Sequence, residues 1–146
     1  MQITTATTAH LPQLAALFDA YRQHYEQAPD PEGAKAYLSE RLSRSESVIY
    51  VAVDDGTVIG FTQLYPVFSS IGMKKAWILN DLFVDPAHRR KGAARALIAA
   101  SRALGENTSA RYIMLQTHIT NKNAQALYEH TGFQRDDEFY YYYLSI

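Results

Sequence analysis

Apolar residues recur along the chain in two rhythms, one typical of helices and one typical of strands. Apolar positions three and four residues apart, such as Leu11 and Leu14, predict amphipathic helices. Asp30 before a proline is typical of a helix start, whereas Gly105 and Gly132 are typical of helix ends. The helices predicted in this way span residues 8–27, 30–44, 91–104 and 121–131.

Stretches rich in β-branched and aromatic residues predict strands between these helices, with a tight hairpin turn at Asp55-Gly56. In the last stretch, Tyr140 to Tyr143 alternate in direction. We expect one pair in the core and the other in an acceptor cleft or a partner interface. The predicted strands span residues 2–5, 48–54, 57–67, 76–84, 111–117 and 139–144.

This order of elements predicts a mixed α/β fold, in which a central mixed β-sheet is flanked by about four helices. No repeat, linker or low-complexity stretch interrupts the chain, so a single domain is expected over residues 1–146.

Composition and charge narrow the classes of protein that fit this pattern. The 146 residues are 47% hydrophobic, with 14 Lys and Arg against 15 Asp and Glu and a net charge of −1. A nucleic-acid-binding module would carry a basic excess, so that function is excluded. The apolar runs are too short to cross a membrane and no targeting segment is seen, so we expect a cytoplasmic protein. The absence of cysteine excludes disulfides, thiolate metal sites and a cysteine nucleophile.

The segment that follows the predicted strand 76–84 has the chemistry of an anion site. Backbone N–H groups and the dipole at a helix start attract phosphate oxygens, and small residues let those oxygens approach. The alternative is a solvated basic turn, and the pattern leaves both open. Three basic residues stand before three small ones here: Arg89, Arg90, Lys91, Gly92, Ala93 and Ala94.

Other chemistry-bearing patterns are missing or ambiguous. Motifs for a P-loop, a dinucleotide site, a hydrolase serine or a helical zinc pair do not occur, so no metal cofactor is expected. In the helix predicted over residues 121–131, Tyr128 shares an apolar face with Ala124 and Leu127 and is expected to point at the sheet. A tyrosine there is more often a core residue than an acid, so this helix alone decides nothing.

Together and in this order, the two segments resemble the GNAT superfamily of acetyl-CoA-dependent N-acetyltransferases. The pattern Arg-x-x-Gly-x-Ala over residues 89–94 is similar to the superfamily's first signature. The pattern Asn-x-x-Ala-x-x-Leu-Tyr-x-x-x-Gly-Phe over residues 121–133 is similar to its downstream motif. The order of elements resembles the GNAT fold over the whole chain. Residues 78–84 and 136–144 further look like small members that acetylate polyamines or other free amines.

The resemblance implies an acetyl-CoA site assembled from separate segments. A strand end would hold the pantetheine arm through its backbone, and the basic turn would hold the pyrophosphate through N–H groups. Tyr128 would protonate the departing thiolate as the amine attacks the thioester directly, a role that suits a phenol beside a thiol of pKa about 8.5. The implied coenzyme contacts are Leu82, Phe83, Val84, the segment Arg89–Ala94, Asn121 and Tyr128.

The general base departs from the family pattern, because Asn80 stands where many relatives carry glutamate. Asp81 is adjacent, but successive strand residues face opposite sides of a sheet, so only one of the two can face the amine unless a bulge intervenes. Our hypothesis is that Asp81 orients or deprotonates the amine through water. The alternative is that Asp81 only stabilises the strand edge.

The resemblance thus favours an N-acetyltransferase that moves an acetyl group to a small-molecule primary amine or polyamine, and it implies a homodimer. One alternative within the family is a protein lysine or N-terminal acetyltransferase. An alternative of another class is a catalytically weak acyl-CoA-binding sensor or scaffold, supported by Asn80 and opposed by Tyr128.

Overall fold

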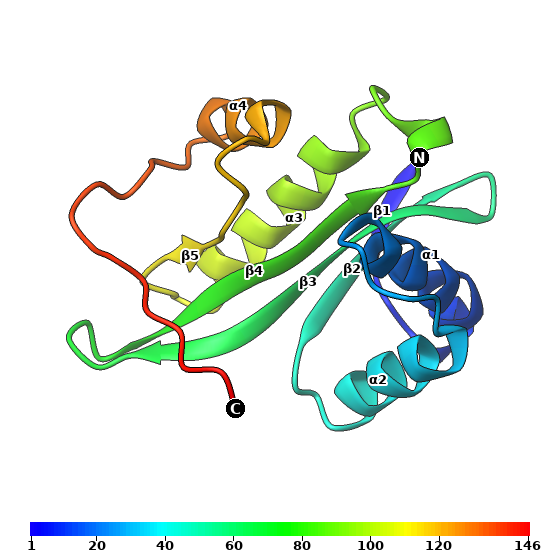
Figure 1. The fold of residues 1–146 in the computed structure, drawn as a ribbon, viewed down its shortest axis with the longest axis horizontal. Helices are drawn as coiled ribbons and strands as arrows, with labels where there is room; N and C mark the ends of the chain where they lie inside the picture. The colour runs from blue at the N-terminus through cyan, green and yellow to red at the C-terminus, as the bar shows by residue number, and fades with distance from the viewer. The chain divides into compact units, whose positions relative to one another are not determined.

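A computed structural model describes all 146 residues. The chain forms two compact units, residues 1–116 and residues 117–146. The larger unit contains a five-stranded sheet and three α-helices, and the smaller unit contains one α-helix (Figure 1). None of the helices is long and apolar enough to span a bilayer.

The sheet of the larger unit is mixed, as predicted. The strand order is β1-β2-β3-β4-β5. Strands β1 to β4 pair with one another in antiparallel orientation, and β5 runs parallel to β4. A parallel neighbour requires a crossover, which the third helix supplies. The strands are β1 (Gln2–Thr5), β2 (Val48–Asp54), β3 (Thr57–Ser69), β4 (Lys74–Val84) and β5 (Ile113–Met114).

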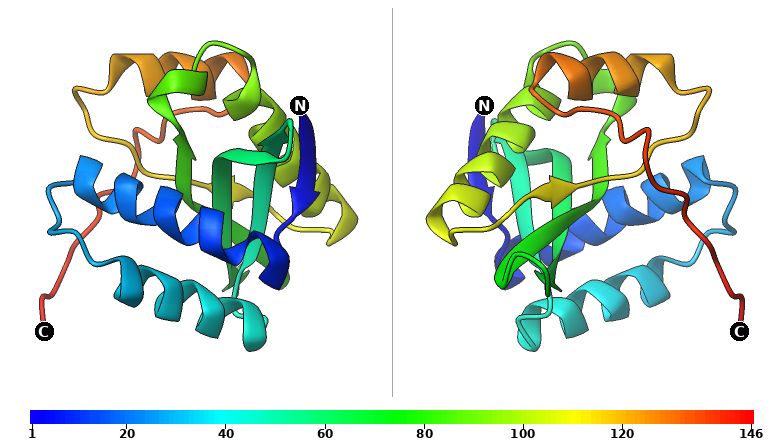
Figure 2. Two further views of the ribbon diagram at one scale, coloured as in Figure 1. Left: turned by 90° about the vertical axis from the view of Figure 1, so that its right-hand side faces the viewer. Right: turned by 90° about the vertical axis from the view of Figure 1, so that its left-hand side faces the viewer.

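Helices cover both faces of this sheet (Figure 1, Figure 2). On one face, α1 (Leu11–His24) and α2 (Pro31–Ser43) pack on β2 and β3 around a core that includes Phe61. On the other face, α3 (Ala93–Asn107) packs through Leu97 against a second core cluster. Short 3-10 turns, Thr8–His10 and Pro86–His88, precede α1 and α3.

Polar side chains connect the ends of α1 and α2. Asp30 caps α2, because its carboxylate accepts a hydrogen bond from the Gly33 N–H at 2.9 Å. Buried Asp19 accepts bonds from the Arg22 guanidinium at 2.9 Å and from the Asp30 N–H at 3.1 Å. The turn between the two helices is therefore held by one carboxylate, which sets where α2 lies on the sheet.

A β-bulge at Asn80 divides β4 into two parts. Gln63 pairs with Asp81, but the next residue of β3 pairs with Leu79, so Asn80 is an extra residue in β4. Leu79 belongs to the core cluster that includes Leu104 of α3, whereas Phe83 belongs to the cluster under α1 and α2. An even spacing would place both on one face in a regular strand, so the bulge reverses the alternation between them.

The smaller unit is built around α4 (Lys122–His130). Asn121 caps this helix by accepting a hydrogen bond from the Ala124 N–H at 3.2 Å. The helix is followed by Gly132, whose φ of 102° lies in the left-handed region that favours glycine. The Tyr128 ring packs edge-on against Phe133, with ring centroids 5.7 Å apart.

The structure corrects four sequence-based predictions. Gly105 lies inside α3 and packs closely on β5, where an added Cβ would meet the Ile113 side chain at 3.2 Å, so it is not a helix cap. The first helix is shorter than predicted, and the strand predicted over residues 111–117 is reduced to β5. Residues 139–144 pair with no strand, and all four tyrosines from Tyr140 to Tyr143 are exposed. Strand propensity does not form a strand where no ladder partner exists.

A leucine-to-alanine substitution should cost more folding stability on the buried face of α3 than in the exposed C-terminal tail. Leu97→Ala removes a fully buried side chain from α3 and should lower the free energy of unfolding by about 2–5 kcal/mol. Leu144→Ala, at a position 87% exposed, is the matched control and should change it by no more than about 0.5 kcal/mol. Urea denaturation followed by circular dichroism measures both, and equal losses would contradict this prediction.

Candidate active site

The bulge turns Asn80 and Asp81 toward the same face of the sheet, the face covered by α1 and α2. The Asn80 amide donates to the Asp81 carboxylate at 3.1 Å, which requires the two neighbouring side chains to lie side by side. Regular alternation would have separated them. Because of the bulge, these two adjacent side chains lie together.

Asp81 is a buried carboxylate held by amide groups. Its side chain is only 4% exposed, and the Gln63 amide donates to its other oxygen at 2.7 Å. Gln63 is itself fully buried and accepts a hydrogen bond from the Ser47 hydroxyl at 2.7 Å. None of the ion pairs of the chain includes Asp81, so neutral donors alone stabilise its charge.

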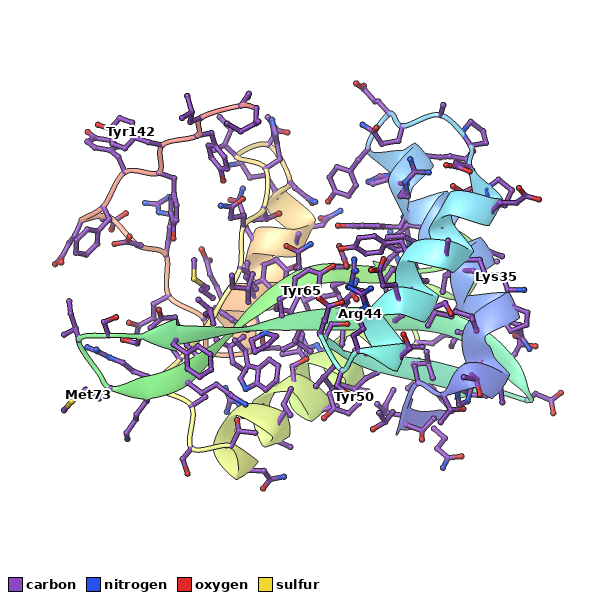
Figure 3. All side chains as sticks on the ribbon, turned by 90° about the horizontal axis from the view of Figure 1, so that it is seen from below. Lys35, Arg44, Tyr50, Tyr65, Met73 and Tyr142 are labelled. Atoms are coloured by element: carbon purple, nitrogen blue, oxygen red, sulfur yellow. The ribbon has the colours of Figure 1, made fainter.

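Tyr21 and Tyr65 face this carboxylate, and Tyr37 lies behind Tyr65. Tyr21 of α1 lies with its hydroxyl 3.5 Å from the Asn80 carbonyl, and its ring packs edge-on against Phe83. Tyr65 of β3 lies beside α2 and shares a hydrogen bond of 2.5 Å with the Tyr37 hydroxyl (Figure 3). The Arg41 guanidinium stacks over the Tyr37 ring, and Glu40 and Glu46 neutralise it. The wall around Asp81 is thus aromatic, with hydroxyl groups at its polar points.

Burial changes the titration of two of these groups. Desolvation raises the pKa of Asp81, while hydrogen bonds from Gln63, Asn80 and Tyr21 act in the opposite direction. Burial also raises the pKa of Tyr65, and the bond to Tyr37 and the negative charge of Asp81 add to this increase. Tyr65 therefore stays a neutral phenol, and Asp81 is easier to protonate than an exposed carboxylate.

The edge of β4 beyond the bulge is open on one side. β5 ends at Met114, which pairs with Ile78, so residues 79–84 have β3 on one side and no strand of the larger unit on the other. The Asp85 N–H bonds the Ile59 carbonyl at 2.9 Å, and bonded positions alternate along an antiparallel pair. Leu82 and Val84 therefore direct their backbone groups toward the open side, whereas Phe83 bonds β3.

The basic turn connects this strand end to α3. Arg90 has a φ of 63° and Gly92, which precedes the first helical residue, a φ of 86°. Backbone in such conformations forms concave N–H surfaces that suit anions, and the first N–H groups of α3 add to them. Arg89 folds back, because its Nε donates to the Val84 carbonyl at 3.1 Å and its guanidinium lies over the Phe83 ring. Arg90 and Lys91 are exposed.

In the smaller unit, the two residues singled out by sequence have different surroundings. Asn121 uses its side chain to cap α4, so its local role is structural. Tyr128 is half-buried on the helix face that also contacts Phe133. The coenzyme and acid roles that the motif implies for them stay predictions.

Sequence reasoning missed the partners of Asp81. Gln63 and Tyr65 belong to β3, Tyr21 belongs to α1, and Ser47 precedes β2, so no local pattern brings these residues to Asp81. One signal was present: Thr62 and Gln63 are adjacent polar residues within an otherwise apolar strand, and both are fully buried. A buried glutamine needs partners for both ends of its amide, so it points to a polar site.

The fold and the relatives of the chain identify it as an acetyltransferase. The crystal structure of a probable acetyltransferase superposes with a TM-score of 0.95 at 42% identity, covering 100% of this chain and 98% of that chain. An aminoglycoside N-acetyltransferase AAC(6')-Iy in complex with CoA shares the fold, with a TM-score of 0.78 at 23% identity, 99% of this chain and 100% of that chain.

The chain belongs to the Acetyltransferase (GNAT) family, whose sequence profile matches residues 14–133. It is 45% identical to an uncharacterized N-acetyltransferase YhfO of Bacillus subtilis, over 100% of this chain and 98% of that protein. It is 31% identical to a probable acetyltransferase of Haemophilus influenzae, over 92% and 90%. An aminoglycoside N(6')-acetyltransferase type 1 of Salmonella typhimurium is 26% identical over 77% and 80%. The family uses acetyl-CoA as its acetyl donor.

The buried state of Asp81 predicts a specific dependence of stability on pH. Because its pKa is raised above 3.8, the folded state keeps a proton that the unfolded state loses as pH rises. The free energy of unfolding of the wild type, minus that of Asp81→Asn, should therefore fall from about pH 4 upward and level off above the raised pKa. Urea denaturation of both proteins across this range measures the difference, and a rising difference would contradict it.

Proposed function

We propose that this acetyltransferase acetylates a primary amine of a small cationic molecule. The observation that carries the proposal is Asp81, a buried carboxylate without an ion-pair partner, set among tyrosines. A carboxylate in aromatic surroundings attracts an ammonium group through charge and through the faces of the rings. Arg41, which stacks over the Tyr37 ring, is neutralised by two glutamates, so it is not free to bind an acidic acceptor.

One relative supports this acceptor class. The aminoglycoside N(6')-acetyltransferase is named for acetylating a molecule that carries amino groups on a small scaffold. Amines of this kind are protonated in water, so each must lose a proton before its nitrogen can attack a thioester. A carboxylate that is easier to protonate than usual suits that step.

In the proposed reaction, each proton has a named carrier. Asp81 accepts the proton of the ammonium group, directly or through water, and leaves a neutral amine. The amine nitrogen forms a bond to the thioester carbonyl carbon, and the carbon–sulfur bond breaks. Tyr128 gives its proton to the departing thiolate, as the motif implies, and the nitrogen of the new amide loses its second proton to the Tyr128 phenolate, which restores the phenol. The products are an N-acetylated amine and CoA, and no acyl-enzyme is formed.

The coenzyme contacts are proposed on the same basis. The backbone groups of Leu82 and the N–H of Val84 on the open side suit the amide groups of the pantetheine arm, whereas the Val84 carbonyl accepts from Arg89. The turn from Arg89 to Ala94 suits the pyrophosphate, since its N–H groups and two exposed cations gather at the start of α3. Arg89 would stabilise the turn rather than contact phosphate, because its side chain is committed to Val84 and Phe83.

The first test is release of CoA thiol from acetyl-CoA, measured with a thiol reagent across diamines, polyamines, aminoglycosides, amino acids and lysine peptides. The chain has no cysteine, so the signal comes from CoA alone. We expect turnover with a small polycation, reduced about 10²-fold or more in Tyr128→Phe and in Asp81→Asn. Tyr142→Phe, at an exposed position of the same unit as Tyr128, is the matched control and should keep the wild-type rate.

Three other outcomes would each change the conclusion. Turnover with lysine peptides alone would replace the small amine with a protein acceptor. Stabilisation by acetyl-CoA without turnover of any amine would favour the sensor or scaffold. A wild-type rate in Asp81→Asn at pH about 7 to 9 would remove Asp81 from the reaction.

The second test concerns the basic turn. Arg90→Gln combined with Lys91→Gln should weaken CoA binding by about three- to tenfold at low salt, and the loss should shrink as salt screens the phosphate charge. Lys35→Gln, which removes a charge at an exposed position of α2 (Figure 3), is the control and should leave the affinity for CoA unchanged. Isothermal titration calorimetry measures the dissociation constant, and an equal loss in both proteins would contradict a local role for the turn.

The homodimer and the cytoplasmic location stay predictions. The exposed aromatic and aliphatic side chains between Phe139 and Ile146 support the homodimer, because a partner interface would bury them.

A further inference from the structure

The hydrogen-bond chain from Ser47 through Gln63 to Asp81 has a property that the proposed reaction needs. Both bonds measure 2.7 Å, and all three side chains are buried. A base inside the protein changes its protonation state in every turnover. Each state must leave the surrounding buried polar atoms paired, because an unpaired one costs about as much as the bond itself.

The glutamine amide can satisfy both states. It has an acceptor oxygen at one corner and a donor nitrogen at the other, and its terminal torsion is broad and roughly two-fold. With Asp81 ionised, the Ser47 hydroxyl donates to Gln63 Oε1 and Gln63 Nε2 donates to the carboxylate. With Asp81 protonated, a half-turn of the amide lets the Asp81 hydroxyl donate to Oε1 while Nε2 donates to the Ser47 oxygen. Two hydrogen bonds are present in each state.

The other groups around Asp81 do not offer this exchange. Asn80 donates to the second carboxylate oxygen and is exposed, so water can replace it. The titratable groups that face Asp81 are the phenols of Tyr21 on α1 and Tyr65 on β3. Behind Tyr65 lies α2, where the Tyr37 hydroxyl is hydrogen-bonded to Tyr65 and the Arg41 guanidinium stacks over the Tyr37 ring. Gln63 is therefore the fully buried neighbour whose donor and acceptor can trade places.

We propose that Gln63, oriented by Ser47, is a positioning residue that turns its amide as Asp81 gains and loses the amine proton. The inference rests on the proposed role of Asp81 as the proton acceptor. It assigns no contact with substrate to Gln63 or Ser47. Their effect is to keep the carboxylate aimed and its hydrogen bonds complete in both protonation states.

The test uses Gln63→Met, which keeps the length of the side chain but removes donor and acceptor. Loss of the Nε2 donor raises the pKa of Asp81, so the acidic limb of the kcat/KM profile should move to higher pH by about one unit. At pH values on the acidic limb, kcat/KM of Gln63→Met should be about tenfold lower than that of the wild type. Thr62→Val is the matched control, because this buried neighbour bonds the Asp81 backbone carbonyl rather than the carboxylate. Its profile should stay in place.

Two further measurements separate positioning from simple structure. NMR of the labelled Gln63 side-chain amide should show both its signals shifting with the pKa of Asp81, and this titration should vanish in Asp81→Asn. Ser47→Thr keeps a hydroxyl and should retain the wild-type profile, whereas Ser47→Ala should shift it in the same direction as Gln63→Met. Circular dichroism shows whether each variant is folded.

The outcomes distinguish this inference from the function on which it rests. If Asp81→Asn abolishes turnover but Gln63→Met leaves the acidic limb and the rate unchanged, the inference is wrong and the proposed function stands. If the amide follows the titration of Asp81 while Asp81→Asn keeps the wild-type rate, the coupling exists but Asp81 is not the proton acceptor. An amide signal that does not change with pH overturns the inference in either case.

Discussion

The β-bulge at Asn80 determines which side chains of β4 reach the site. Before the bulge, Leu79 packs toward α3. After it, Leu82 packs toward α3, whereas Asp81 and Phe83 point toward α1 and α2. In a regular strand of the same sequence, Asp81 would share the face of Leu79 and would point into the opposite core. The bulge also brings an amide donor beside the carboxylate. The chemistry of the site therefore depends on one irregular position in a long antiparallel pair.

A buried carboxylate without a cation is costly, and the surrounding residues explain why it is tolerated here. Donors from Gln63, Asn80 and Tyr21 offset part of the desolvation, but the pKa of Asp81 still lies above its ordinary value. A strong ion pair would have held the proton acceptor permanently charged and occupied the place of a cationic acceptor. Neutral donors leave the position beside Asp81 without a cation. The cost in folding stability is therefore consistent with a proton-accepting role of Asp81.

The strand end and the basic turn form one connected piece of backbone. The Arg89 side chain joins them by bonding the Val84 carbonyl and covering the Phe83 ring. The left-handed conformations at Arg90 and Gly92 then direct the chain into α3. Leu97 anchors that helix to the sheet, so the core under α3 positions the exposed N–H groups of the turn.

Local patterns in the sequence account for the helices and most strands, the helix start at Asp30, the basic turn and the family motif, because caps, periodicities and glycine positions act over a few residues. Tertiary structure alone decided the bulge, the partners of Asp81 and the absence of a strand over residues 139–144. Gln63 and Asp81 are 18 residues apart and meet only through strand register. Register and ladder partners are non-local properties, and no local pattern contains them.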